Sequence, residues 1–194
     1  IGTTSFFPSK NLGCYGDGGA LFTNDDNLAS KIRSISNHGM KVRYYHDDIG
    51  VNSRLDTIQA AILRIKLKNL DIYNNARKAA ADFYDKAFSV CPSIIIPERK
   101  SYSTHIFHQY TLKIQNNKRE ELKEYLDLKK IPSMIYYPVP LHRQKAFSFL
   151  GYKDGDFPVT EKLCNEVISL PMHPDLDQNQ LEYITSNVLK FFDK

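Results

Sequence analysis

Lys10 lies in the setting of this sequence that best suits covalent chemistry. It follows Pro8, whose ring fixes the backbone, and precedes Gly13 in a loop of small residues. More glycines follow within a few positions: Gly16, Gly18 and Gly19. A lysine amine that a protein desolvates, or places beside another cation, can bond to an aldehyde. The alternative is an exposed loop lysine, and composition alone favours that alternative.

Other arrangements of reactive residues are weaker. His105 and His108 suggest a metal site, but residues 105–114 alternate like a strand, on which residues three apart face opposite sides. The glycine spacing after Lys10 matches neither a dinucleotide fingerprint nor a P-loop. The net charge of +4 comes without clustered Lys and Arg. We therefore expect no metal site and no nucleic-acid partner.

The cysteines and the hydropathy pattern bear on the compartment. The cysteines are odd in number and far apart, which favours a reducing environment over a disulfide scaffold: Cys14, Cys91 and Cys164. No apolar run has the length of a membrane-spanning helix, and no signal-like segment opens the chain. We expect a cytoplasmic protein that does not associate with membranes.

Longer motifs continue the pattern that surrounds Lys10. The first reads Ser5-x-x-Pro8-Ser9-Lys10-Asn11-Leu12-Gly13-x-x-Gly16-Asp17-Gly18-Gly19-Ala20. The others follow in order: Asn37-His38-Gly39, Gly50-x-Asn52-Ser53-Arg54-Leu55-Asp56-x-x-Gln59-Ala60-Ala61, Tyr137-Pro138-x-Pro140-Leu141-His142-x-Gln144, Gly155-Asp156-Phe157-Pro158-Val159 and Ser169-Leu170-Pro171-Met172-His173-Pro174. Together they resemble the DegT-type sugar aminotransferases, which are fold-type I enzymes that use pyridoxal phosphate (PLP). The resemblance covers nearly the whole chain.

The resemblance implies a fold and an activity. The fold is α/β, a partial fold-type I PLP-transferase with the end of the large domain followed by a small α/β domain. The activity is transfer of an amino group, with glutamate as the expected donor, to a keto group of a nucleotide-linked deoxysugar. Lys10 would attach PLP and later shuttle a proton. Related dehydratases carry histidine at this position, so Lys10 favours the aminotransferase.

Two polar residues are the candidates for binding the cofactor phosphate. A serine hydroxyl and an asparagine amide both donate hydrogen bonds to phosphate oxygens, and the resemblance assigns these roles to Ser5 and Asn52. It also implies that Asn52 reaches the cofactor of a partner subunit, which predicts a homodimer with shared active sites. The alternatives are a turn cap for Ser5 and a residue before a helix for Asn52.

The candidate substrate contacts are an arginine and four ring-bearing residues. Arg54 lies where a helix is expected to start, and a cation there opposes the helix dipole unless an anionic ligand or a carboxylate pairs with it. Aromatic faces and imidazoles suit the sugar and the pyrophosphate of a nucleotide sugar, as the resemblance implies for Tyr45, His46, Tyr137 and His142. The alternative for each of the four is a structural role.

The family also predicts what this chain does not contain. Its members carry a long portion before the lysine, with an aspartate for the cofactor ring nitrogen, an aromatic that stacks on the ring, and a phosphate-binding turn. We therefore expect this chain to be a C-terminal portion that is inactive alone. The alternatives are a non-catalytic fragment and a regulatory protein of the same fold.

Local patterns in the first half predict the elements that position these residues. A buried strand is expected over 19–23, and a helix after 24–26 that ends with Gly39 in a left-handed conformation. The loop 40–52 is long enough to be functional. Ser53 and Asp56 have the spacing of a capping box before helical residues up to 88, with a break between 68 and 73.

The second half reads as a small two-layer domain. Strands are expected over 105–114, 133–137 and 167–170, with a helix over 118–130 and the start of another within 157–167. A capping box at Asp177 and Gln180 predicts a last helix. The predicted domain boundary separates 1–89 from 90–194.

Overall fold

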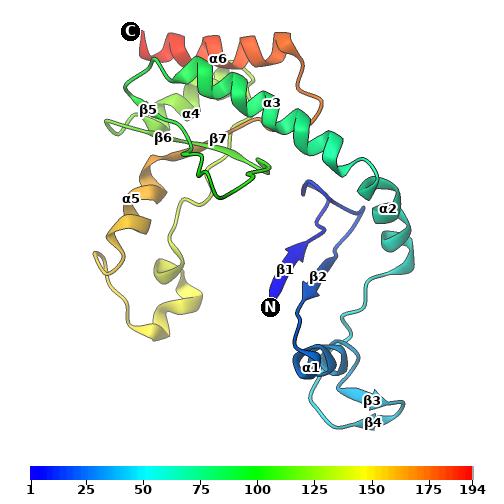
Figure 1. Cartoon of the computed structure of the whole chain (residues 1–194). Coiled ribbons are helices and arrows are strands. Elements are labelled where there is room, and N and C mark those ends of the chain that lie inside the picture. The colour runs from blue at the N-terminus through cyan, green and yellow to red at the C-terminus, as the bar shows by residue number, and fades with distance from the viewer. Residues whose placement is uncertain (194) are drawn as a thin grey trace. The chain divides into compact units, whose positions relative to one another are not determined.

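The structure is a computed structural model that describes residues 1–193. Figure 1 shows the order of the elements along the chain. The chain forms two compact units, the first spanning Ile1–Ile72 and the second beginning at Tyr73. This division falls earlier than residue 89 because most of helix α3, Leu70–Phe88, packs with the core of the second unit. The assignment of these units to a large and a small domain stays a prediction.

The first unit opens with an antiparallel hairpin. Strand β1, Gly2–Ser5, pairs with β2, Gly19–Phe22, so that Ser5 lies opposite Gly19. The expectation of a buried strand here is wrong, because Leu21 is 54% exposed and Phe22 is 59% exposed. The sheet has two strands only, and the other elements of this unit leave these side chains uncovered.

Helix α1, Asp26–Ser36, has the ends that its sequence predicts. The Asp25 carboxylate accepts a hydrogen bond from the Leu28 amide at 3.0 Å. Gly39 has a φ of +74°, and its amide donates to the Ser34 carbonyl at 2.7 Å. The chain then forms a small hairpin of β3, Met40–Val42, and β4, Tyr45–His46, within the predicted loop.

Two helices follow, with the break where it was predicted. Helix α2, Thr57–Leu67, ends just before α3 begins at Leu70. The predicted capping box is wrong, because the N-cap is Asp56 and its side chain makes no capping hydrogen bond. The amide of Ser53 instead donates to the Ser36 carbonyl at 2.9 Å, so Ser53 belongs to the segment that returns along the end of α1.

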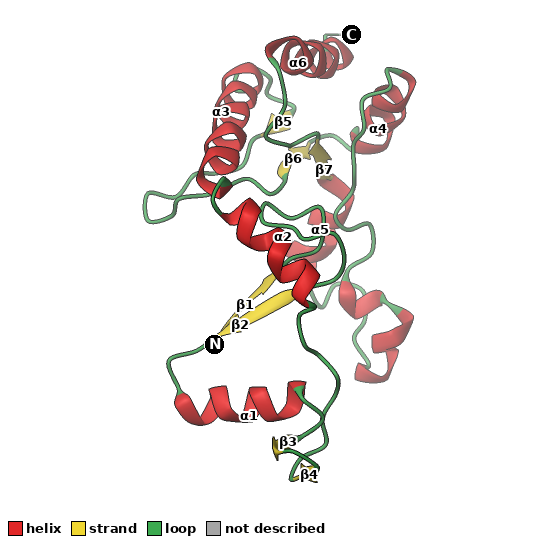
Figure 2. Cartoon of the chain, turned by 90° about the vertical axis from the view of Figure 1, so that its right-hand side faces the viewer, coloured by secondary structure: helices red, strands yellow, loops and turns green. Residues whose placement is uncertain are grey.

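The second unit is built on a three-stranded antiparallel sheet. Its order is β5, Ile94–Ile95, then β6, Tyr110–Ile114, then β7, Val167–Leu170. Figures 1 and 2 show helices α3, α4 (Arg119–Leu128) and α6 (Gln178–Phe192) on one side of this sheet. They enclose an apolar core with the strands, which includes Tyr84, Phe88, Leu112, Leu122, Ile168 and Val188.

Two predicted strands of this unit are shorter or absent. Residues 105–109 are not in β6, because Phe107 takes a φ of 47° and turns its ring into the core before the strand starts at Tyr110. Residues 133–137 make only an isolated bridge, in which Met134 pairs with Ser169. Alternation of side chains alone did not distinguish these segments from strands.

Local capping and one buried arginine complete this unit. The capping box at Asp177 and Gln180 forms as predicted, and α5 spans Pro158–Glu166 after two short 3-10 helices, η1 (Leu141–Arg143) and η2 (Lys145–Leu150). Arg77 is buried, and its Nη1 donates to three carbonyl oxygens, those of Phe107, His108 and Met172. Within residues 1–193, no helix combines the length and apolarity needed to cross a membrane.

Candidate functional site

The loop that carries Lys10 is closed by backbone hydrogen bonds. The Lys10 amide donates to the Phe7 carbonyl at 2.9 Å, and the Phe6 amide donates to the Gly18 carbonyl at 2.8 Å. The Cys14 amide donates to the Phe6 carbonyl, also at 2.8 Å. The lysine therefore stands on a turn whose two limbs are bonded to each other, directly after the β1 strand.

Glycines allow this turn to close tightly. A Cβ at Gly13 would lie 2.6 Å from the Pro8 carbonyl oxygen and 2.7 Å from that of Phe7. These are backbone atoms that cannot move aside, so a larger residue at this position would open the turn. The close backbone contact is what a fixed, half-buried lysine requires.

The thiol of Cys14 is part of the same closure. It is fully buried, and its Sγ lies 3.0 Å from the Phe6 carbonyl oxygen and 2.9 Å from that of Gly16. A buried thiol that donates to backbone oxygens supports the turn. This contact is consistent with the small structural side chain that the sequence favours for Cys14.

Ser5 and Asn52 have groups suited to a phosphate. The Ser5 Oγ is exposed and accepts a hydrogen bond from the Phe7 amide at 3.2 Å, which leaves its O–H proton as a donor. Arg54 Nε donates to the Asn52 Oδ1 at 3.1 Å, which directs the Asn52 amide NH2 away from the guanidinium. An amine, a hydroxyl and an amide of the first unit fit the aldehyde and the phosphate of PLP.

The position of Asn52 is fixed by the end of α1. Asn52 forms an antiparallel bridge with Asn37, and the next amide in the chain is the one that bonds to Ser36. Tyr45 lies on the β4 strand and is 70% exposed. His46 follows it, with its Nδ1 at 2.8 Å from the His38 carbonyl oxygen. These rings thus lie on a hairpin that emerges from the same end of α1.

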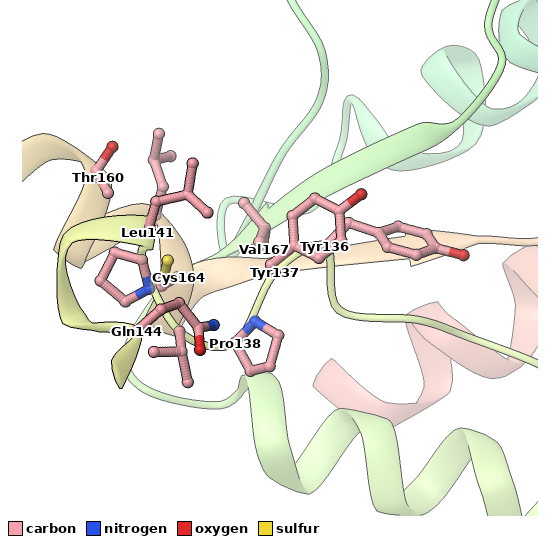
Figure 3. Close-up of a pocket in the computed structure, with 11 residues that line it drawn as sticks. Tyr136, Tyr137, Pro138, Leu141, Gln144, Thr160, Cys164 and Val167 are labelled. Atoms are coloured by element: carbon pink, nitrogen blue, oxygen red, sulfur yellow. The ribbon is translucent and has the colours of Figure 1, made fainter. Parts of the chain in front are cut away.

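Tyr137 lines a cavity of the second unit. The cavity has a volume of about 470 Å³, and Figure 3 shows its polar groups, Gln144, Thr160 and Cys164, among apolar side chains such as Leu141 and Val167. Tyr137 itself is 70% exposed. Apolar walls with a few polar groups are typical of small-molecule sites.

His142 is held inside this unit more firmly than the sequence suggests. Its side chain is only 6% exposed, its Nε2 lies 3.1 Å from the Glu161 Oε1, and its ring is 4.8 Å from that of Phe157. Glu161 also accepts hydrogen bonds from the Gly155 and Phe157 amides, which, with the Gly155 contact as the main cause, lower the pKa of its carboxyl. One edge of His142 lines a second cavity of about 400 Å³.

The predicted site residues therefore fall into two groups. One group belongs to the first unit: Ser5, Lys10, Tyr45, His46, Asn52 and Arg54. The other, Tyr137 and His142, belongs to the second unit. Within the described residues, no group of acidic, histidine and cysteine side chains has the arrangement of a metal site.

Sequence reasoning missed two residues that support these groups. Gln59 accepts a hydrogen bond from the Tyr15 amide, and Glu161 anchors His142. No local signal marked either contact, because each joins segments that are distant in sequence. Gln59 does fall within the family motif, where only its identity was visible.

Comparison with known proteins gives relatives of one kind that match nearly all of this chain. The pleiotropic regulatory protein of Geobacillus stearothermophilus is 45% identical over 98% of the chain and 51% of its own length. UDP-N-acetyl-3-dehydro-alpha-D-glucosamine 3-aminotransferase of Acidithiobacillus ferrooxidans is 44% identical over 96% of the chain and 49% of its own length. The chain thus spans about half the length of these relatives.

Solved structures give the same result. The crystal structure of DesV from S. venezuelae, solved in complex with a ketimine intermediate, matches with a TM-score of 0.94 and 36% identity. The match covers 99% of this chain and 51% of DesV. Residues 1–189 match the family described as the DegT/DnrJ/EryC1/StrS aminotransferases. The chain belongs to this aminotransferase family, and its α/β fold is that of a partial fold-type I enzyme.

Proposed function

We propose that the whole protein is a PLP-dependent aminotransferase that moves an amino group from an amino acid, with glutamate as the expected donor, to a keto group of a nucleotide-linked deoxysugar. The observation that carries this proposal is the closed turn around Lys10, in which Gly13 has no room for a side chain. Such a turn holds one amine in a fixed place. Membership of the family and the named activity of the Acidithiobacillus relative support the same reaction.

Each residue of the first unit has a role in this proposal. PLP, when bound, supplies the electron sink for the transfer. The Lys10 Nζ attaches the cofactor aldehyde and, once released, carries a proton to or from the substrate carbon. Ser5 Oγ donates to the cofactor phosphate of its own subunit, and the Asn52 amide donates to that of a partner. This sharing makes the protein a homodimer.

The substrate contacts are assigned by chemistry and exposure. Arg54 places a guanidinium beside Asn52, where it binds an anionic group such as a phosphate or carboxylate. Tyr45, His46 and Tyr137 present accessible rings to the sugar or the nucleotide. His142 acts mainly through its contact with Glu161, and shapes the segment behind Tyr137.

A regulatory protein of the same fold is the second candidate. The observation that favours it is the name of the Geobacillus relative, a pleiotropic regulatory protein. In that case the protein would keep the cofactor and lose amino transfer to a sugar. The reducing compartment indicated by three free cysteines places either candidate in the cytoplasm.

Reductive trapping tests the attachment of PLP. The full-length gene product is mixed with PLP, reduced with borohydride and mapped by mass spectrometry. We expect a single adduct on Lys10, which is absent from Lys10→Ala and strongly reduced in Gly13→Ala. Adducts scattered over surface lysines such as Lys41 and Lys153, with none preferred on Lys10, would refute the assignment of Lys10.

A half-reaction separates the aminotransferase from the regulatory protein. The PLP-loaded protein is incubated with glutamate labelled with nitrogen-15, and the cofactor is then extracted. Labelled pyridoxamine phosphate, with one equivalent of 2-oxoglutarate, is the expected result. A protein that carries PLP on Lys10 but yields no labelled product within hours is a regulatory or non-catalytic member of the family.

A further inference from the structure

We propose that Gln59 is a positioning residue for Lys10, because its side chain fixes the returning limb of the lysine turn to helix α2. The inference rests on the proposed function, since it concerns the placement of the Lys10 amine. The Tyr15 amide donates to the Gln59 Oε1 at 2.8 Å, and the two residues are 44 positions apart. This hydrogen bond joins the turn to a helix that no local sequence rule connects with it.

The turn lies along one face of α2 and the residues just before it. Leu55, Gln59 and Lys66 are spaced four and seven residues apart, so they fall on the same helical face. Leu55 Cδ1 lies 3.0 Å from where a Cβ of Gly18 would stand, and the Lys66 Nζ lies 5.6 Å from the Tyr15 ring centroid. The contact is therefore a docking surface with Gln59 near its middle.

Glycine at position 16 makes room for the glutamine. A Cβ at Gly16 would lie 3.1 Å from the Gln59 Nε2 and 3.5 Å from its Cδ. The amide group thus lies flat against the backbone of the turn. The absence of side chains at Gly16 and Gly18 allows a helix side chain to reach a main-chain N–H of the turn.

Gln59 has a local alternative that it does not use. It is the third residue after the N-cap Asp56, where a glutamine commonly bonds back to the N-cap amide, as Gln180 does at the start of α6. Its Oε1 instead serves Tyr15. A side chain taken from a favourable local cap for a distant contact indicates that the distant contact is the one that matters.

The contact also sets the spacing between the two halves of the candidate site. Lys10 belongs to the turn, whereas Asn52 and Arg54 directly precede α2. By tying the turn to α2, Gln59 holds the lysine at a set distance from the segment with Asn52 and Arg54. Loss of this contact would leave Lys10 in place chemically but free to move.

The test compares three variants of the full-length protein. Gln59→Met keeps the length of the side chain and removes the acceptor, whereas Gln59→Glu keeps an acceptor oxygen. Ile58→Ala changes a neighbouring side chain that is 71% exposed and serves as the matched control. Hydrogen–deuterium exchange is measured without PLP. We expect the Tyr15 amide to exchange about fivefold faster in Gln59→Met only, the range for one lost hydrogen bond.

A second readout connects the contact to Lys10. The share of borohydride-trapped PLP on Lys10, relative to all other lysines, should fall in Gln59→Met and recover in Gln59→Glu, at an unchanged melting temperature. A purely structural role would lower the melting temperature without changing this share. Equal exchange at Tyr15 in Gln59→Met and Ile58→Ala would overturn the proposal.

Two outcomes keep the inference separate from the proposed function. If no variant, wild type included, labels Lys10 preferentially, the aminotransferase assignment fails, and with it the role of Gln59 in placing a reactive amine. If Gln59→Met does not fold, the wild-type protein still decides. Tyr15 is 76% exposed, so its amide exchanges at the rate of an open loop unless Gln59 protects it. An unprotected Tyr15 amide overturns the proposal.

Discussion

The two units of this protein are held together by different forces. Among the described apolar residues, those that are buried in the first unit are Cys14 and Leu63, whereas the second unit contains a continuous core from α3, α4, α6 and the sheet. The first unit relies on backbone hydrogen bonds, glycine contacts and side-chain bonds such as that of Gln59. It also carries most of the candidate chemistry.

This difference teaches where stability and function lie. A unit with an apolar core gains folding free energy from burial, whereas a unit with mostly exposed side chains gains little. Candidate catalytic residues therefore stand on the less stabilised unit, in agreement with the tendency of active segments to come from regions of low local stability. Four measurements can break or sharpen this contrast.

The largest effect is expected from a leucine in the core of the second unit. Leu112 is fully buried, so Leu112→Ala should lower the free energy of unfolding by about 2–5 kcal/mol. Leu21 in the first unit is 54% exposed, and Leu21→Ala should cost about 0.5 kcal/mol or less. Urea unfolding followed by circular dichroism measures both. Similar losses in the two variants would remove the contrast between the units.

A buried arginine gives the next largest effect. Arg77 supplies the donor for three carbonyl oxygens, so Arg77→Met should lower the free energy of unfolding by about 2–3 kcal/mol. Arg64 on α2 is exposed, and Arg64→Met is the matched control, with an expected cost of about 0.5 kcal/mol or less. Thermal unfolding compares them. An Arg77→Met protein as stable as the control would show that the second unit does not depend on this link.

Two helix caps allow a matched comparison of the units. The Asp177 carboxylate accepts from the Gln180 amide at 2.8 Å, and the Asp25 carboxylate accepts from the Leu28 amide at 3.0 Å. Asp177→Ala should cost about 1 kcal/mol of stability for the whole second unit. Asp25→Ala should instead speed amide exchange in α1 alone. Hydrogen exchange by mass spectrometry distinguishes the two, and an effect of Asp25→Ala that spreads beyond α1 would contradict the expectation.

The smallest effect depends on pH. The pKa of the Glu161 carboxyl is lowered from its ordinary value of 4.5, mainly by the hydrogen bond from the Gly155 amide. Because the folded pKa lies below the unfolded one, the stabilisation is complete above pH 4.5 and is lost as the pH falls through the folded value. Glu161→Gln should flatten the loss of stability below pH 4.5, measured by thermal unfolding at each pH. The exposed Glu124→Gln is the control, and an identical acid profile for both variants would contradict the prediction.

Much of the fold followed from local patterns. The N-cap of α1, the left-handed Gly39, the break before α3 and the capping box of α6 depend on residues within one or two helical turns, so the sequence predicted them. The family motifs likewise predicted the turn around Lys10. The predicted cap at Ser53 and the full strand over 105–114 were wrong, because contacts with α1 and with the core outweighed the local pattern.

The sequence by itself thus determined the helices, their ends, the family and the lysine that is the candidate for chemistry. Only the tertiary structure decided that Gln59 bonds to Tyr15, that Glu161 and Phe157 enclose His142, and that β2 stays exposed. The physical reason is the range of each interaction. Caps and helical periodicity act between near neighbours and leave a mark in the sequence, whereas a hydrogen bond across 44 residues depends on how separate segments pack.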